Sequence, residues 1–152
     1  MMEIAYDRAS LALVARVSGN TSDEDLSRFG EAIVELDRDT AGRTELPVTI
    51  LIVIMGQERP SAEQRRMMAD LWNPVKAPVH VFALVSKSPI ALGILKVVQW
   101  LNPPGAKRRE SAHGNFEDAA KWAERQRGKP IPVLGVLYER LTGKAPQSVA
   151  RR

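Results

Sequence analysis

The 152-residue chain is predicted to be an α/β domain with a mostly parallel sheet that opens with an antiparallel hairpin. Nearly continuous apolar runs, rich in β-branched residues, occur at 47–55 and 79–85, as expected for parallel strands buried on both faces. Segments with apolar residues at helical spacing alternate with these strands, the pattern of β-α-β units. The expected element order is ββαβαβαβα, followed by a short C-terminal helical tail.

The opening hairpin and the first helix follow from local patterns. Short apolar runs at 3–6 and 11–17 flank a polar turn, which is typical of a hairpin. We expect Thr21 to cap the first helix, in a capping box with Glu24. Four apolar residues at spacings of three and four then form one stripe that would lie on the sheet: Leu26, Phe29, Ile33 and Leu36.

The next two helices carry clear start signals. Ser61 and Gln64 form a second capping box after the strand at 47–55. Ser88 caps the third helix, with Pro89 at its first position, where the missing N–H costs nothing. Both helices therefore begin just after buried strands.

The last part of the domain is predicted to hold an edge strand and a fourth helix. Residues 107–112 carry charge, which an edge strand tolerates. Asn115 caps the fourth helix, and Gly128 ends it. The domain is expected to span 1–128, and residues 129–152 to form a tail that is amphipathic and then loose.

The third helix is apolar on more than one side. Five residues share one face, which we expect to lie on the sheet: Ile90, Ile94, Val97, Val98 and Leu101. Three more apolar side chains fall outside that face and form the expected interaction surface: Leu92, Leu95 and Trp100. A second subunit, a ligand or a membrane surface would cover them, or else the tail through Val133, Leu137 and Leu141.

Composition argues against several function classes. The absence of cysteine excludes disulfides and thiolate metal sites, and His80 and His113 have no partner at metal-ligand spacing. No metal or other cofactor is therefore expected. No serine stands out as an activated nucleophile, so the protein is not expected to be an enzyme. The net charge is +4, but aromatic content is only 5% and acids accompany the basic clusters, so a nucleic-acid partner is not expected.

The chain is expected to be cytoplasmic. Its N-terminus lacks the basic start and apolar run of a signal peptide. The longest apolar segment, residues 89–101, is interrupted by Lys96 and is shorter than the about 20 residues that cross a bilayer, so no transmembrane helix is expected.

The loops after the two central strands are the candidate binding rim. Ligands of open α/β sheets gather beyond the carboxyl ends of the strands, and here two helix N-termini would point to that edge. An anion rim is one interpretation, and an ordinary polar surface is the favoured alternative. The residues concerned are Arg59, Ser86, Lys87 and Ser88. No glycine-rich phosphate loop is present, so a nucleotide is not expected.

The layout resembles SpoIIAA-like or STAS-type domains over residues 2–127. Besides the hairpin and the capped first helix, the resemblance is carried by five segments: 51–54, 60–66, 81–85, 88–104 and 116–122. Such domains are mostly protein-binding modules, and the best-known ones are switched by phosphorylation of a serine that begins a helix after a central strand. Ser61 occupies that position, but the Asp-Ser pair of that motif is absent here, which favours a plain helix cap.

Two functions are therefore expected from the sequence. The first, implied by the resemblance and by the over-apolar third helix, is a non-enzymatic protein-interaction or regulatory module that is homo-oligomeric. The alternative is a carrier or sensor of an apolar or lipid-like ligand, at the membrane surface. It rests on the third helix, the basic charge and the likeness of SpoIIAA-like proteins to lipid-binding CRAL-TRIO domains.

Overall fold

The computed structural model describes residues 1–55, 59–103, 105 and 107–144. These residues form a sheet of five strands: β1 (Met2–Asp7), β2 (Ala12–Gly19), β3 (Val48–Met55), β4 (His80–Val85) and β5 (Arg108–His113). They also form five helices: α1 (Asp23–Thr40), α2 (Ala62–Asp70), α3 (Pro89–Leu101), α4 (Phe116–Arg127) and α5 (Val133–Thr142). The predicted α/β class and element order are confirmed.

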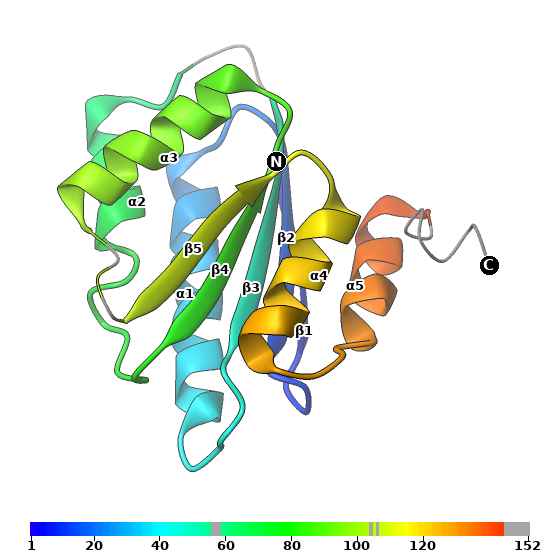
Figure 1. The fold of residues 1–152 in the computed structure, drawn as a ribbon. Helices are drawn as coiled ribbons and strands as arrows, with labels where there is room; N and C mark the ends of the chain where they lie inside the picture. The colour runs from blue at the N-terminus through cyan, green and yellow to red at the C-terminus, as the bar shows by residue number, and fades with distance from the viewer. Residues whose placement is uncertain (56–58, 104, 106, 145–152) are drawn as a thin grey trace.

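The strands lie in the order in which they occur in the chain (Figure 1). β1 pairs antiparallel with β2, and the pairs β2–β3, β3–β4 and β4–β5 are parallel. Right-handed connections between neighbouring parallel strands place their helices on one face of the sheet. Accordingly α1, α2 and α3 lie on one face, while α4 and α5 lie on the other (Figure 1).

Alternation along the central strands builds two apolar cores. On β4, Phe82 and Leu84 pack in the cluster beneath α1–α3. Val81, Ala83 and Val85 pack in the cluster with α4 and α5. All six residues of β4 are buried, which explains why this strand reads as a continuous apolar run.

The start of α1 differs from the expectation by one residue. Ser22 is the N-cap: its hydroxyl accepts from the N–H of Asp25 at 3.0 Å, and the carboxylate of Asp25 accepts from the N–H of Ser22 at 3.2 Å. The predicted box of Thr21 and Glu24 is therefore wrong. Two overlapping pairs have the right chemistry, and local sequence does not choose between them. The predicted caps Ser88, Asn115 and Gly128 are confirmed.

The tail belongs to the second core. α5 packs against β1 and β2, beside α4, which covers the β3–β5 half of the same face. Leu134 and Leu137 are each only 1% exposed. The alternative in which the tail covers the third helix is wrong, because α3 lies on the opposite face (Figure 1). Without α5 the β1–β2 half of this face would be bare.

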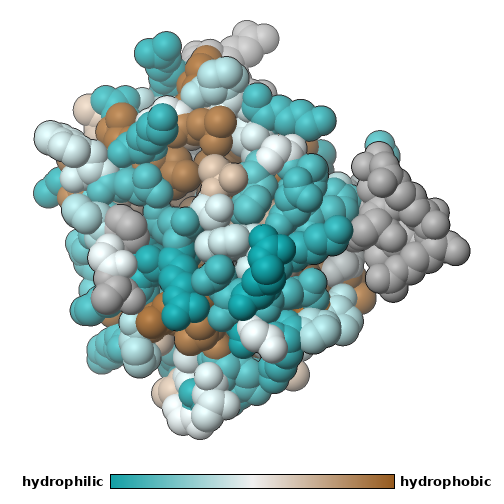
Figure 2. Space-filling model, viewed as in Figure 1, coloured by the Kyte–Doolittle hydropathy of each residue, from teal (hydrophilic) through white to brown (hydrophobic). Residues whose placement is uncertain are grey.

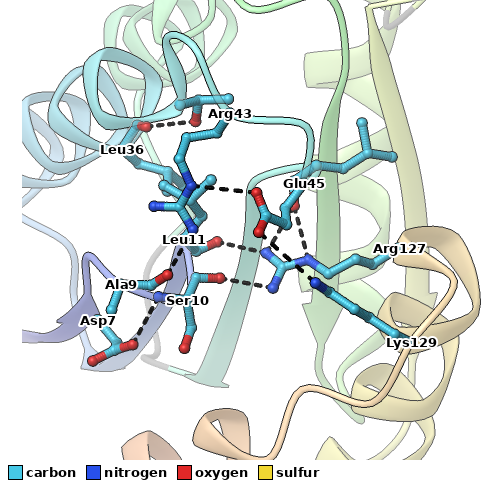
Figure 3. Close-up of polar contacts among 11 residues, drawn as sticks. Asp7, Ala9, Ser10, Leu11, Leu36, Arg43, Glu45, Arg127 and Lys129 are labelled. Atoms are coloured by element: carbon cyan, nitrogen blue, oxygen red, sulfur yellow. Dashed lines mark hydrogen bonds and ion pairs between the residues drawn. The ribbon is translucent and has the colours of Figure 1, made fainter.

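Arg127, the last residue of α4, ties this helix to the edge of the sheet where β2 and β3 begin (Figure 3). Its guanidinium donates to the carbonyl of Ser10 at 2.7 Å, to that of Leu11 at 2.9 Å and to that of Leu46 at 2.7 and 3.0 Å. Ser10 and Leu11 lie in the turn between β1 and β2, and Leu46 leads into β3. The planar fork of arginine suits it to several carbonyls at once.

Replacement of Arg127 by Ala should lower the free energy of unfolding by about 2 kcal/mol, because half-buried carbonyls lose a charged donor. Urea unfolding followed by circular dichroism measures the change. Arg125→Ala is the matched control, since Arg125 is exposed in the same helical turn, and it should change the value by less than about 0.5 kcal/mol. Equal effects of the two replacements would contradict the clamp.

Candidate functional site

An apolar cavity of about 240 Å³ lies between the sheet and the layer of α1, α2 and α3. Its floor is formed by side chains of β3 and β4: Leu51, Val53, Phe82 and Leu84. Leu26 and Phe29 of α1 form one wall, and Ala91, Ile94, Leu95 and Val98 of α3 form the opposite wall. Above the floor, the chain around α2 contributes Met68, Leu71 and Trp72.

The shortness and packing of α2 account for this space. α2 has nine residues and is about 13 Å long, whereas α1 has 18 residues and is about 27 Å long. α2 packs mainly on α1 and α3, and Ala69 is its only fully buried residue. Gly30 of α1 permits the close approach of Leu71, since a Cβ there would lie 2.9 Å from Leu71 Cδ2. The middle of the helical layer is thus held away from the sheet.

The cavity opens at the carboxyl edge of the sheet. Its exposed lining residues are Gly19, Asn20 and Arg59, which lie where β2 and β3 end. Gln64 lies at the same edge, and its amide donates to the carbonyl of Thr21 at 3.0 Å and to Asp23 Oδ1 at 3.0 Å. The starts of α1 and α2 are therefore tied together across the rim.

A buried polar cluster closes the side of the cavity near β5. Glu110 lines the cavity, and its side chain is 4% exposed. One carboxylate oxygen accepts from Gln99 Nε2 at 2.6 Å, and the other pairs with Arg108 Nε. The guanidinium of Arg108 lies 4.9 Å from the centre of the Trp72 ring. Because the carboxylate is paired on both oxygens, it fastens α3 to β5 and presents no free charge to the cavity.

Ser61 has the predicted capping role at the start of α2. Its hydroxyl accepts from the N–H of Gln64 at 3.1 Å, and Gln64 Oε1 accepts from the N–H of Ser61 at 3.1 Å. Gln64 thus both completes the capping box and bridges to α1. Ser61 is exposed, and its phosphorylation, the less favoured alternative, is not tested by the structure.

The predicted anion rim is divided in the structure. Arg59 lines the cavity, but the other three residues do not. Ser86 is buried, and its hydroxyl accepts from the N–H of Ser88, whose own hydroxyl accepts from the N–H of Ile90. Lys87 is exposed. Ligand crevices at sheet edges form where helices diverge to opposite faces, and α1, α2 and α3 all lie on the same face.

The orientation of α3 differs in part from the expectation. Leu92 and Leu95, expected on the outer side, pack against the core cluster on the sheet, whereas Ile90 and Val97, expected on the sheet, are each 40% exposed. Ile94 and Val98 face inward as expected and line the cavity. Trp100 is outside the core, as expected, and is 80% exposed. Because apolar residues surround this helix, their periodicity does not determine which side meets the sheet.

A buried Asp–His pair anchors α1 to β4. His80 Nε2 lies 2.9 Å from Asp37 Oδ1, and the same carboxylate accepts the N–H groups of Lys76 and Ala77. Burial lowers the pKa of His80, and hydrogen bonds lower the pKa of Asp37 against the opposing effect of burial. His80 is therefore neutral, and its Nδ1 has no hydrogen-bond partner among the residues that the structure describes. With no hydroxyl on Nδ1, the pair lacks the geometry of a nucleophilic triad.

Two further observations complete the site. Among the described residues, no group of three or more histidine, aspartate or glutamate side chains is arranged to hold a metal ion. None of the helices in the described ranges combines the length and apolar character needed to cross a membrane.

Comparisons with protein-family models, with curated proteins and with solved structures found no match to this chain. The architecture is consistent with a STAS-like arrangement, and it establishes the class of the protein as a mixed α/β domain with a cavity beneath one helical layer.

The Ser61 cap predicts a modest contribution to stability that depends on the side chain at this position. Ser61→Ala should lower the free energy of unfolding by about 1 kcal/mol, because the N–H of Gln64 loses its acceptor. Ser61→Asp should retain the wild-type value, since a carboxylate also caps. Thermal and urea unfolding measure both, and an Ala variant as stable as the wild type would contradict this role.

The buried histidine predicts a loss of stability in mild acid. The pKa of His80 is lowered from 6.5, so below that pH the unfolded chain binds a proton that the folded chain excludes. The free energy of unfolding should therefore decrease from pH 7 to 5, by at most about 1.4 kcal/mol per pH unit for one group. The lowered pKa of Asp37 adds a further loss below about pH 4.

His113 contributes to the same window, because burial also lowers its pKa. His80→Gln and His113→Gln, each measured by urea unfolding at several pH values, separate the two contributions. A slope between pH 7 and 5 that is unchanged in His80→Gln would exclude His80 as the source.

Proposed function

We propose that the protein is a non-enzymatic carrier or sensor that binds an apolar or lipid-like ligand in the cavity between the sheet and α1–α3. The observation that carries the proposal is the cavity itself, whose floor and walls are almost entirely apolar side chains. Such a surface favours burial of hydrocarbon by the hydrophobic effect, at roughly 0.8 kcal/mol per methylene group. Ligand sites of this kind are commonly apolar with few polar groups.

The size of the cavity limits the ligand. Its volume of about 240 Å³ exceeds the about 150 Å³ of an apolar cavity that admits benzene. It is smaller than the roughly 300 Å³ at which drug-sized sites begin. A small apolar molecule, or the end segment of an acyl chain, fits this range.

Arg59 supports an anionic head group on that ligand. It is exposed, lines the cavity and lies at the edge where the cavity opens. Gln64 is already engaged by Ser61, Thr21 and Asp23, so Arg59 is the charged donor best placed at the rim. A carboxylate or phosphate would pair with its guanidinium while the chain enters the cavity.

A protein-interaction or regulatory module of STAS type is the second candidate function. The sheet is consistent with that class, and the uncovered apolar side chains of α3 favour contact with another surface. The cavity favours ligand binding over this candidate, because a pure docking module has no need of an apolar cavity beneath its helices. Sizing chromatography of the purified protein tests for a homo-oligomer.

The cavity predicts binding of a dansyl-labelled fatty acid. Ala91→Phe places a ring in the cavity from the α3 wall and should lower the affinity for the probe at least about tenfold. The free energy of unfolding should be unchanged or higher, because the ring fills empty space. Val136→Phe, on the exposed face of α5, is the matched control and should bind the probe as the wild type does. Fluorescence titration measures the affinity.

Val53→Phe offers an independent way to fill the cavity, from the floor instead of the wall. If the wild type and both filled variants bind the probe equally, the proposed site is wrong. Overpacking a filled core lowers the free energy of unfolding by roughly 1–3 kcal/mol. If Ala91→Phe has that effect, the space is not open to a ligand.

A further inference from the structure

We propose that the outer face of α3 docks on the surface of an anionic lipid bilayer. The inference rests on the proposed function and names the source of the ligand: a membrane against which the cavity wall is placed. The occupant is argued from three observations, namely an exposed apolar stripe, the charge around it, and its continuity with the cavity.

The exposed stripe runs along one side of α3. Ile90 and Val97 are each 40% exposed and Trp100 is 80% exposed. Together with Gly93 they are spaced by three, four and three residues, so they share one helical face. A Cβ built on Gly93 meets no atom within 4 Å, so the face is bare in its middle as well. Figure 2 shows hydrophobic residues gathered on the part of the surface that contains α3.

The charge beside the stripe is mainly positive. Between Asp70 and Glu110 the chain has no acidic residue, whereas it has six basic ones: Lys76, Lys87, Lys96, Lys107, Arg108 and Arg109. Of these, Arg108 is buried and Arg109 donates to Gln126 of α4, so Lys87 and Lys96 are the charges nearest the stripe. Asp70 of the neighbouring helix α2 is paired with Arg66. Lys87 directly precedes the helix cap and Lys96 lies in the helix, and both are exposed. Glu110, where the acid-free segment ends, is buried and paired with Arg108. The surface is therefore complementary to a negatively charged partner.

An anionic bilayer matches both properties together. Interfacial helices carry apolar side chains that enter the lipid boundary and lysines that remain at the head groups. Tryptophan is enriched at that boundary because its ring is apolar with one polar N–H. A second copy of this chain would bring the same positive charges together, and repulsion would oppose that contact.

The same helix forms the cavity wall. Ala91, Leu95 and Val98, on the inner side of α3, line the cavity, while Ile90, Val97 and Trp100 are exposed on the outer side. One helix thus separates the ligand space from the proposed bilayer contact.

Co-sedimentation with vesicles tests the docking. The full chain should bind vesicles of phosphatidylcholine mixed with phosphatidylglycerol and bind pure phosphatidylcholine vesicles at least about tenfold more weakly, with the difference reduced by salt. The double variant Val97→Glu with Trp100→Glu should lose at least about tenfold in partitioning. Val136→Glu, an equally exposed change on α5, should bind as the wild type does.

Three results would overturn the proposal. The first is vesicle binding that the double variant does not change. The second is equal binding to both vesicle compositions. The third is a wild type that binds no vesicles and forms a homodimer, with the double variant monomeric.

The dansyl-labelled fatty acid distinguishes this proposal from the proposed function. The double variant should bind the probe in solution with the affinity of the wild type. Ala91→Phe should bind the probe more weakly and bind vesicles as the wild type does. Vesicle binding by a wild type that does not bind the probe would support docking and contradict the cavity.

Discussion

The placement of α1, α2 and α3 on a single face of the sheet is the constraint from which the candidate site follows. Parallel strands in sequential order, joined by connections of one hand, leave no other face for these helices. The face they share is roughly 19 Å wide, four strand spacings, and neighbouring helices pack 8–10 Å apart, roughly. Three helices leave no space above the sheet only if the middle helix also packs on the strands. α2 is short, packs on its two neighbours and leaves the cavity beneath it.

The two faces of the sheet differ in how completely they are closed. α4 and α5 divide the opposite face between them and bury Phe116, Leu134 and Leu137 there. Arg127 adds a charged clamp to the carbonyls at the sheet edge. These side chains belong to the apolar core on this side of the sheet. The helical layer with the cavity has instead its polar ties at the edges, through Gln64 at one and Glu110 at the other. The closed core and the cavity thus lie on opposite faces of the sheet.

Sequence patterns predicted the elements well and the faces poorly. The caps at Ser61, Ser88 and Asn115 follow from side chains that bond to main-chain groups within three residues, so short sequence windows contain the whole interaction. The cap of α1 shifted from Thr21 to Ser22 because two overlapping pairs compete. The cavity was not predicted, since its lining comes from elements far apart in the chain. Its one local signal was the weak apolar stripe of residues 62–70, which is poorly suited to cover a sheet.

By itself, the sequence determined the strand and helix order, the buried character of β3 and β4, and most helix starts, because these depend on periodicity and on contacts between near neighbours. Tertiary structure alone decided which side of α3 meets the sheet. It also decided that α5 completes the far core and that Arg59 joins the cavity while Lys87 does not. These outcomes depend on competition for the same apolar surface between segments distant in sequence. In a helix with apolar residues on more than one side, the periodicity does not determine which side faces the sheet.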